Sequence, residues 1–111
     1  MLRILDYLKR NLRFVPDPVG VEAIATPSFH LLAIQRDGFS AGDCDDAATL
    51  AGALARAVGA PVRLALASFR PDRKFHHTWA EGLASGVWVQ LDPFRAERTA
   101  ARPTRLVYQG V

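Results

Sequence analysis

The segment between Gly42 and Pro61 limits the possible folds of this chain more than any other part of the sequence. Asp43 is a suitable N-terminal cap for a helix, and Gly59 followed by Pro61 would end one. The residues between these signals form one apolar stripe at helical spacing: Ala47, Leu50, Ala51, Leu54 and Val58. We therefore predict a helix that starts at Asp43 and packs against the core along this stripe.

Three extended runs follow the predicted helix: Val62–Phe69, Phe75–Leu83 and Val87–Leu91. Pro71-Asp72 indicates a turn between the first two runs, and Ala84-Ser85-Gly86 a turn between the last two. One helix followed by an antiparallel meander is an α+β pattern.

The residues before the central helix carry weaker signals. Apolar residues at helical spacing predict a short amphipathic helix over about residues 2–13, ending before Pro16. The stretch from Pro16 to about Gly42 is rich in proline and glycine. We expect loops there, with a helical turn around Ser28 to Ile34.

A chain of 111 residues is a usual size for one compact domain. The sequence contains no internal repeat and no low-complexity linker. We predict a single domain over residues 1–111, with its core at about 37–94 and a basic tail at about 95–111.

The cysteine count and the hydropathy indicate a location. A single cysteine, Cys44, cannot form a disulfide within the chain, and a lone thiol suits a reducing compartment. Charged residues interrupt the apolar N-terminus, unlike a signal peptide, and no later stretch is long enough for a membrane span. We expect a cytoplasmic protein without a membrane partner. Its oligomeric state is left open.

The formal net charge of +3 suggests a nucleic-acid partner at first sight. Much of the excess lies in the tail, at Arg95, Arg98, Arg102 and Arg105, opposed by Glu97. No aromatic residue lies between these arginines, and no nucleic-acid motif surrounds them. We favour a solvated or packing role for the arginines over nucleic-acid binding, which stays a rival function.

Cys44 lies in the first turn of the predicted central helix. A rotation of about 100° per residue puts its sulfur at the edge of the apolar stripe. The helix dipole stabilises a thiolate there by about 0.3–1 kcal/mol, whereas the neighbouring aspartates oppose one. The sulfur therefore needs a cationic partner to become a good nucleophile.

The predicted hairpin supplies such a partner. If its turn is centred between Ala84 and Ser85, His77 and Asp92 lie directly opposite each other and share one face, with Cβ atoms about 5 Å apart. Asp92 could then orient the imidazole and leave its other nitrogen for Cys44, as in a triad. A register shift of one residue would place Asp92 on the wrong face.

Four segments around these residues resemble the transglutaminase-like superfamily: Gly42-Asp43-Cys44-Asp45-Asp46-Ala47, Ala57-Val58-Gly59-Ala60-Pro61-Val62-Arg63, His77-Thr78-Trp79-Ala80-Glu81 and Trp88-Val89-Gln90-Leu91-Asp92-Pro93. The resemblance covers about Asp37 to Phe94. It implies a papain-like fold, in which a central cysteine-bearing helix packs on a small antiparallel sheet. Asp17-Pro18-Val19-Gly20-Val21-Glu22 and Pro27 further resemble small phage and prophage members.

The same resemblance implies roles for individual residues. Cys44 would be the nucleophile, His77 the general base and acid, and Asp92 the residue that orients His77. The chain has no tryptophan before Trp79, although transglutaminases proper use an upstream aromatic near the oxyanion. Gln35 is a candidate second oxyanion donor beside the Cys44 N–H. Trp79 could shield the imidazole and line the acyl pocket, although core packing is its simpler role.

Several other residues have competing interpretations. His76 points to the face opposite His77, so we favour His77, and we expect His30 at the surface or in a cap. Glu81 is expected to be solvated or paired with an arginine, and Arg63 to be structural. Cys44, His77 and Asp92 could also ligate zinc, but paired metal-binding spacings are missing from the sequence. We expect no metal and no organic cofactor.

These observations together predict thiol-dependent acyl transfer on a peptide or protein amide. We favour hydrolysis, as in a cysteine peptidase or amidase. Transamidation is the alternative enzymatic function. A catalytically silent binding module, such as a component of a phage particle, is the alternative outside enzymology.

Overall fold

The computed structural model describes residues 1–15, 26–94 and 102–111. Its helices are α1 (Leu2–Asn11), α2 (Pro27–Asp37) and α3 (Cys44–Ala57). Its strands are β1 (Leu12–Phe14), β2 (Ser40–Gly42), β3 (Val62–Ser68), β4 (His77–Ala84), β5 (Val87–Leu91) and β6 (Arg105–Gly110). The segment at residues 17–22 that resembles phage proteins lies outside the described residues, as do Arg95, Glu97 and Arg98.

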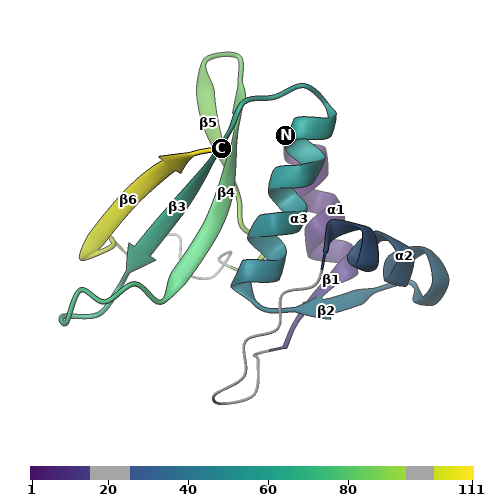
Figure 1. Ribbon diagram of the computed structural model, residues 1–111, viewed down its shortest axis with the longest axis horizontal. Helices are drawn as coiled ribbons and strands as arrows, with labels where there is room; N and C mark the ends of the chain where they lie inside the picture. The colour runs from purple at the N-terminus through teal and green to yellow at the C-terminus, as the bar shows by residue number, and fades with distance from the viewer. Residues whose placement is uncertain (16–25, 95–101) are drawn as a thin grey trace.

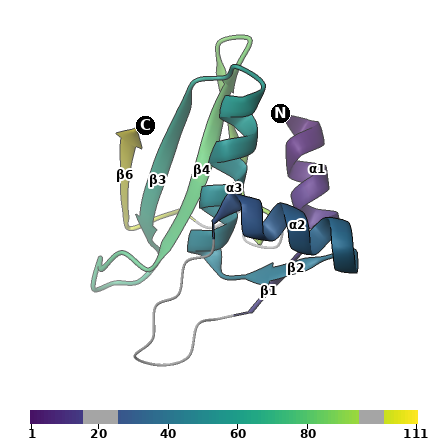
Figure 2. The ribbon, with the colours of Figure 1, turned by 45° about the vertical axis from the view of Figure 1, so that its right-hand side comes forward.

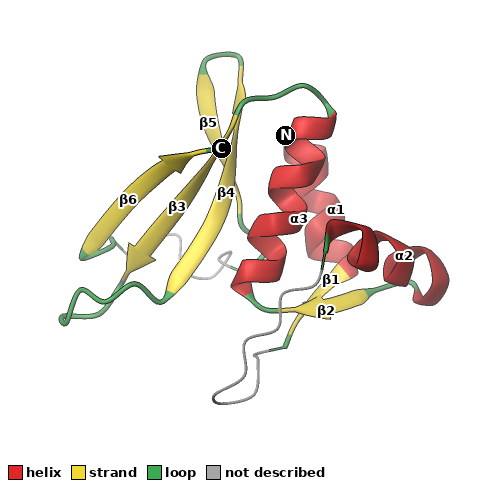
Figure 3. Ribbon diagram, viewed as in Figure 1, coloured by secondary structure: helices red, strands yellow, loops and turns green. Residues whose placement is uncertain are grey.

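Two layers form the protein. Strands β3 to β6 make an antiparallel sheet in the order β5-β4-β3-β6, and α3 packs against β4 and β3. Figure 3 shows the strands of this sheet on one side and the helices on the other. The core between the layers consists of small and branched apolar residues: Leu8, Leu50, Ala51, Ala55, Val62, Ala80 and Leu91. Mixed helix and sheet in this arrangement confirm the predicted α+β class.

Helix α3 begins where the sequence predicts. The Asp43 carboxylate accepts hydrogen bonds from the N–H groups of Asp45 and Asp46, at 3.0 and 3.3 Å. The Asp46 carboxylate in turn accepts from the Asp43 N–H at 3.1 Å, which completes a capping box. The predicted stripe faces the core except at its end, because Val58 is the C-terminal cap and is exposed.

The register of the β4–β5 hairpin differs from the prediction by two residues. Ala84 pairs with Val87 and Leu83 with Trp88, so the loop is Ser85-Gly86. Both loop residues have positive φ, 51° and 78°, as a type I′ hairpin turn requires. Sequence reasoning centred the turn one residue earlier and therefore placed His77 directly opposite Asp92, which is wrong.

The expectation of loops before the central helix is only partly correct. Helix α2 fills much of this region: Thr26 caps it by accepting from the Phe29 N–H, Pro27 is its first residue, and Gly38 ends it at φ 83°. This start and stop are a known helix signal that the sequence analysis missed. Strands β1 and β2 pair in parallel, and Figure 2 shows them with α2 beside the start of α3.

The C-terminal stretch contains a strand rather than only a tail. Strand β6 pairs with β3 from Arg105 opposite Ser68 to Gly110 opposite Arg63. The Arg105 guanidinium lies 4.2 Å from the centre of the Phe75 ring, so this arginine packs on the protein. None of the helices in the described parts of the chain has the length and apolar character of a membrane span.

Candidate active site

Cys44, His77 and Asp92 lie at the ends of three different elements. Cys44 is the first residue of α3, His77 is the first residue of β4, and Asp92 directly follows β5. The first turn of α3 and the start of β4 both lie in the lower half of the molecule in Figure 1. The packing of α3 on the sheet therefore brings together side chains that are far apart in the sequence.

The His77 ring connects the other two side chains. Its Nε2 lies 2.6 Å from Oδ2 of Asp92, and the ring lines the same pocket as Cys44, which lies close enough to raise its pKa. The second carboxylate oxygen of Asp92 accepts from the Phe94 N–H at 3.0 Å. Both oxygens of Asp92 are thus engaged, which holds the carboxylate in a fixed orientation toward His77.

The protonation of His77 follows from these contacts. The side chains of His77 and Asp92 are only 10% and 3% exposed. Burial lowers the pKa of His77, but the hydrogen bond to Asp92, the nearby Cys44 and the charges of both groups outweigh it and raise the pKa from 6.5 to about 9. At neutral pH the ring is therefore a cation next to Cys44 and holds a proton that it can donate.

Trp79 forms the wall behind the imidazole. Its side chain is 1% exposed, and its ring centre lies 5.6 Å from that of His77. The indole N–H donates to Glu81 at 2.8 Å. Trp79 therefore packs against His77, and its burial places it behind the pocket rather than in its lining. A direct contact of Trp79 with substrate stays a prediction.

A buried ion pair supports this wall. Glu81 is 2% exposed, and one of its oxygens accepts from Nε and Nη2 of Arg63, at 2.9 and 2.8 Å. The Arg63 guanidinium lies between two aromatic rings, 4.3 Å from the centre of Trp88 and 3.7 Å from that of Tyr108. Glu81 is thus paired rather than solvated, and Arg63 has the structural position expected for it.

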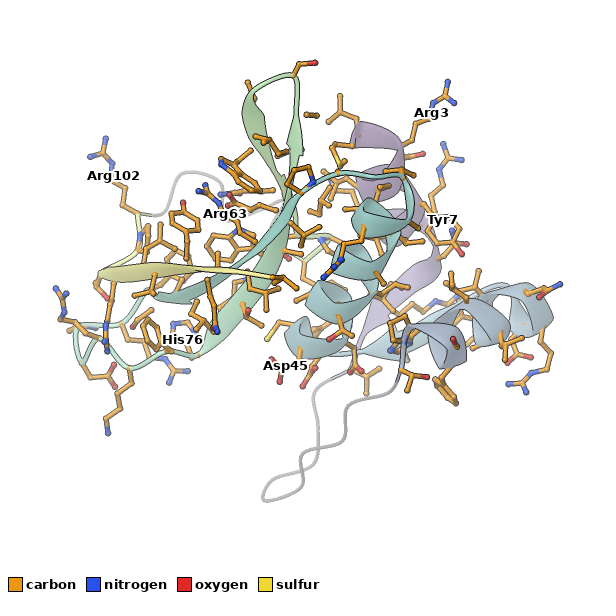
Figure 4. The ribbon with its side chains drawn as sticks, turned by 45° about the horizontal axis from the view of Figure 1, so that its top comes forward. Arg3, Tyr7, Asp45, Arg63, His76 and Arg102 are labelled. Carbon is orange, nitrogen blue, oxygen red and sulfur yellow. The ribbon has the colours of Figure 1, made fainter. Side chains whose placement is uncertain are left out.

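A pocket of about 300 Å³ gives access to the sulfur. It is lined by residues 43–45 of the α3 start, by Leu66 of β3 and by residues 75–78 around the start of β4. Figure 4 labels Asp45 and His76, which lie on the helix side and on the sheet side of this pocket. His76 Nε2 accepts from the Phe69 N–H at 2.9 Å, so this ring lines the pocket while it supports the preceding loop.

A second histidine stabilises the start of α3, and the sequence analysis placed it wrongly. His30 is completely buried, not at the surface. Its Nδ1 lies 2.7 Å from the Ser40 hydroxyl and its Nε2 lies 3.1 Å from Oδ1 of Asp46. Asp46 therefore serves both the capping box and His30. This network joins α2, β2 and the turn that carries Cys44. The available sequence signal was the capping-box spacing, in which the acid Asp46 lies three residues after the cap Asp43.

Gln35, the candidate oxyanion donor, lies on an exposed face of α2. The residues that line the Cys44 pocket do not include it. Its role at the oxyanion stays a prediction. Within the described residues, no group of three or more His, Cys, Asp or Glu side chains has the geometry to hold a metal ion.

Comparison with known proteins agrees with this arrangement. The model of the transglutaminase-like superfamily matches residues 1–93. The chain belongs to the transglutaminase-like superfamily. This membership confirms the resemblance read from the four sequence segments, which lie inside the matched range. No curated protein matches the chain by sequence search.

The fold of the chain matches part of a larger solved structure. The chain is similar to a proposed cysteine protease from Cytophaga hutchinsonii, with a TM-score of 0.58 and 20% sequence identity. The match covers 99% of the present chain and 43% of the other. At this identity the likeness establishes the fold, and it confirms the papain-like architecture that the family implies.

Proposed function

We propose that this transglutaminase-like protein is a cysteine hydrolase that cleaves an amide bond through a thioester on Cys44. The observation that carries the proposal is the His77–Asp92 hydrogen bond of 2.6 Å beside a pocket that Cys44 and His77 both line. A nucleophile, a base and a group that orients the base are the parts needed for acyl transfer by a thiol.

The proposed reaction has two steps. The Cys44 thiolate attacks the amide carbonyl carbon, the S–C bond forms, the C–N bond breaks, and His77 gives its proton to the departing amine. A water then attacks the thioester carbon and His77 takes one of its protons. The S–C bond breaks, which releases a carboxylic acid and restores the Cys44 thiolate beside the protonated His77. The raised pKa of His77, about 9, supports the first step because the ring holds a proton at neutral pH.

Stabilisation of the oxyanion is expected from the start of α3. Cys44 is the first residue of the helix, and the first N–H groups of a helix have no acceptor within it. The Cys44 N–H can therefore donate to the developing oxyanion, with support from the helix dipole.

Transamidation is the second candidate, favoured by the acidic side of the pocket. Asp43 and Asp45 line the pocket with Cys44, and their carboxylates would attract a protonated amine as acyl acceptor. Product analysis in the presence of methylamine separates the two reactions. Hydrolysis yields a carboxylic acid, whereas transamidation yields the methylamide.

The proposed function is tested by alkylation with iodoacetamide at pH 6, followed by intact mass spectrometry. An active thiolate reacts quickly at this pH, and His77→Ala should slow the reaction by about tenfold or more. Incubation with candidate peptides should then trap an acyl adduct on Cys44. Slow alkylation that does not change in His77→Ala would instead support a catalytically silent module.

A further inference from the structure

A second hollow, which we call the α3–β3 groove, borders the Cys44 pocket. Its volume is about 440 Å³, and it shares three lining residues with that pocket: Asp45, Leu66 and Thr78. A common border of three residues makes the two hollows neighbours. A molecule bound at Cys44 could therefore extend directly into the groove.

One face of α3 forms the helix side of the groove. This face repeats every three or four positions: Asp45, then Ala48 and Thr49, then Gly52 and Ala53, then Arg56. This face is about 16 Å long, because a helix rises 1.5 Å per residue. Its middle positions carry small side chains. A Cβ atom on Gly52 would lie 3.6 Å from Cγ1 of Val62, so the helix backbone approaches β3 closely there.

Apolar side chains line the middle of the groove. Val62, Leu64 and Leu66 line it from β3. Its two threonine hydroxyls donate to the main chain: Thr49 to the Asp45 carbonyl and Thr78 to the Ala65 carbonyl, each at 2.8 Å. The charged side chains of the groove, Asp45 and Arg56, lie at the two ends of its helix face. A concave site of this size and lining favours a bulky apolar group.

We propose that the α3–β3 groove is a subsite for a bulky apolar group of the acyl donor, next to the amide that Cys44 attacks. The proposal rests on the proposed function and adds the substrate class. Continuity with the Cys44 pocket favours the substrate as occupant, because a protein docked along the groove would border the entrance to the thiol.

Two alkylating probes of different size test the subsite. Iodoacetamide and N-hexyl iodoacetamide both form an S–C bond with Cys44 and release iodide. We expect the hexyl probe to react at least tenfold faster than iodoacetamide at low concentration, by intact mass spectrometry. A probe with a polar ether chain of matched length should show no such advantage.

Groove variants then locate the effect. Thr49→Trp places an indole in the groove and should reduce the rate ratio of hexyl probe to iodoacetamide to near one. Ala53→Leu is a smaller change with the same expected direction, for use if Thr49→Trp does not fold. Ala57→Trp, at the exposed end of α3 and outside the groove, should keep the ratio of the unmodified protein.

The outcomes separate the two proposals. Rapid alkylation by iodoacetamide with a ratio near one in the unmodified protein overturns the subsite and leaves the proposed function standing. Slow alkylation that His77→Ala does not change overturns the proposed function itself. A dimer in sedimentation that Thr49→Trp dissociates would assign the groove to a second copy of the chain and also overturn the subsite.

Discussion

His77 and Asp92 meet beyond the last paired residues of the β4–β5 ladder. The last pair of the ladder is Ala80 with Leu91, and Asp92 is the next residue after Leu91. From there its Oδ2 reaches Nε2 of His77 at 2.6 Å, while its other oxygen accepts from the Phe94 main chain. The carboxylate is thus held by both the turn after β5 and the imidazole, and we expect the protonation of His77 to depend on it.

Asp92→Asn should lower the pKa of His77 from about 9 toward its usual value of 6.5, because the amide removes a negative charge and keeps the shape. The pKa can be measured by NMR titration of the imidazole. Alkylation of Cys44 at pH 8 should slow by about tenfold or more, because the protonated share of His77 falls by more than tenfold at that pH when its pKa returns to 6.5. Asp6→Asn, at an exposed position of α1, should change neither quantity. An unchanged His77 pKa in Asp92→Asn would contradict the role of Asp92.

The stability of the protein should fall as the pH rises from neutral to alkaline. The pKa of His77 is raised on folding, so protonation favours the folded state. This contribution is fully present below about pH 6.5 and is lost as the pH passes about 9. Its size is on the order of 3 kcal/mol. Urea unfolding between pH 6 and pH 10 should show the decrease, and His77→Gln should flatten it. Equal pH profiles for both proteins would refute the assignment.

Gly42→Ala should destabilise the protein by about 1–3 kcal/mol. A Cβ atom at this position would lie 2.5 Å from Cβ of Asp46, and Asp46 cannot move away without losing its contacts to Asp43 and His30. Gly110→Ala is the matched control, because a Cβ atom there would meet nothing within 4 Å. Thermal or urea unfolding measures both variants. Equal stabilities of the two variants would show that the turn before α3 accommodates the extra methyl group.

Arg63→Met should destabilise the protein by about 3–5 kcal/mol, because it leaves the buried Glu81 carboxylate without its cation. The double variant with Glu81→Gln should recover most of this loss, since no buried charge is left. Unfolding curves of the unmodified protein, the two single variants and the double variant form a complete cycle. Additive effects of the two substitutions would mean that the pair is not coupled.

The main elements around the candidate site were predictable from short sequence patterns. Asp43 and the stripe after it predicted the start of α3, and the three extended runs match β3, β4 and β5 within two residues at each end. These predictions succeed because caps, turns and hydrophobic periodicity act between neighbouring residues. Helix α2 carries comparable local signals in its cap Thr26, in Pro27 at its start and in Gly38 at its end.

The hairpin shows why a wrong register still predicted the correct contact. The true register differs from the predicted one by two residues, and side chains alternate between the faces of a strand with a period of two. His77 and Asp92 therefore share a face in both registers. The alternation of faces can be read from the sequence. Which residues of β4 and β5 pair is set by the turn, in which Ser85 and Gly86 both have positive φ.

The sequence by itself determined where α3 and strands β3 to β5 lie, which face of α3 is buried and which three residues are candidates for chemistry. Only the tertiary structure decided that His30 is buried against Ser40 and Asp46, that β6 completes the sheet beside β3, and that a groove borders the Cys44 pocket. The reason is the range of the interactions. Caps and turns are set by adjacent residues, but burial and cavities depend on how distant segments pack together.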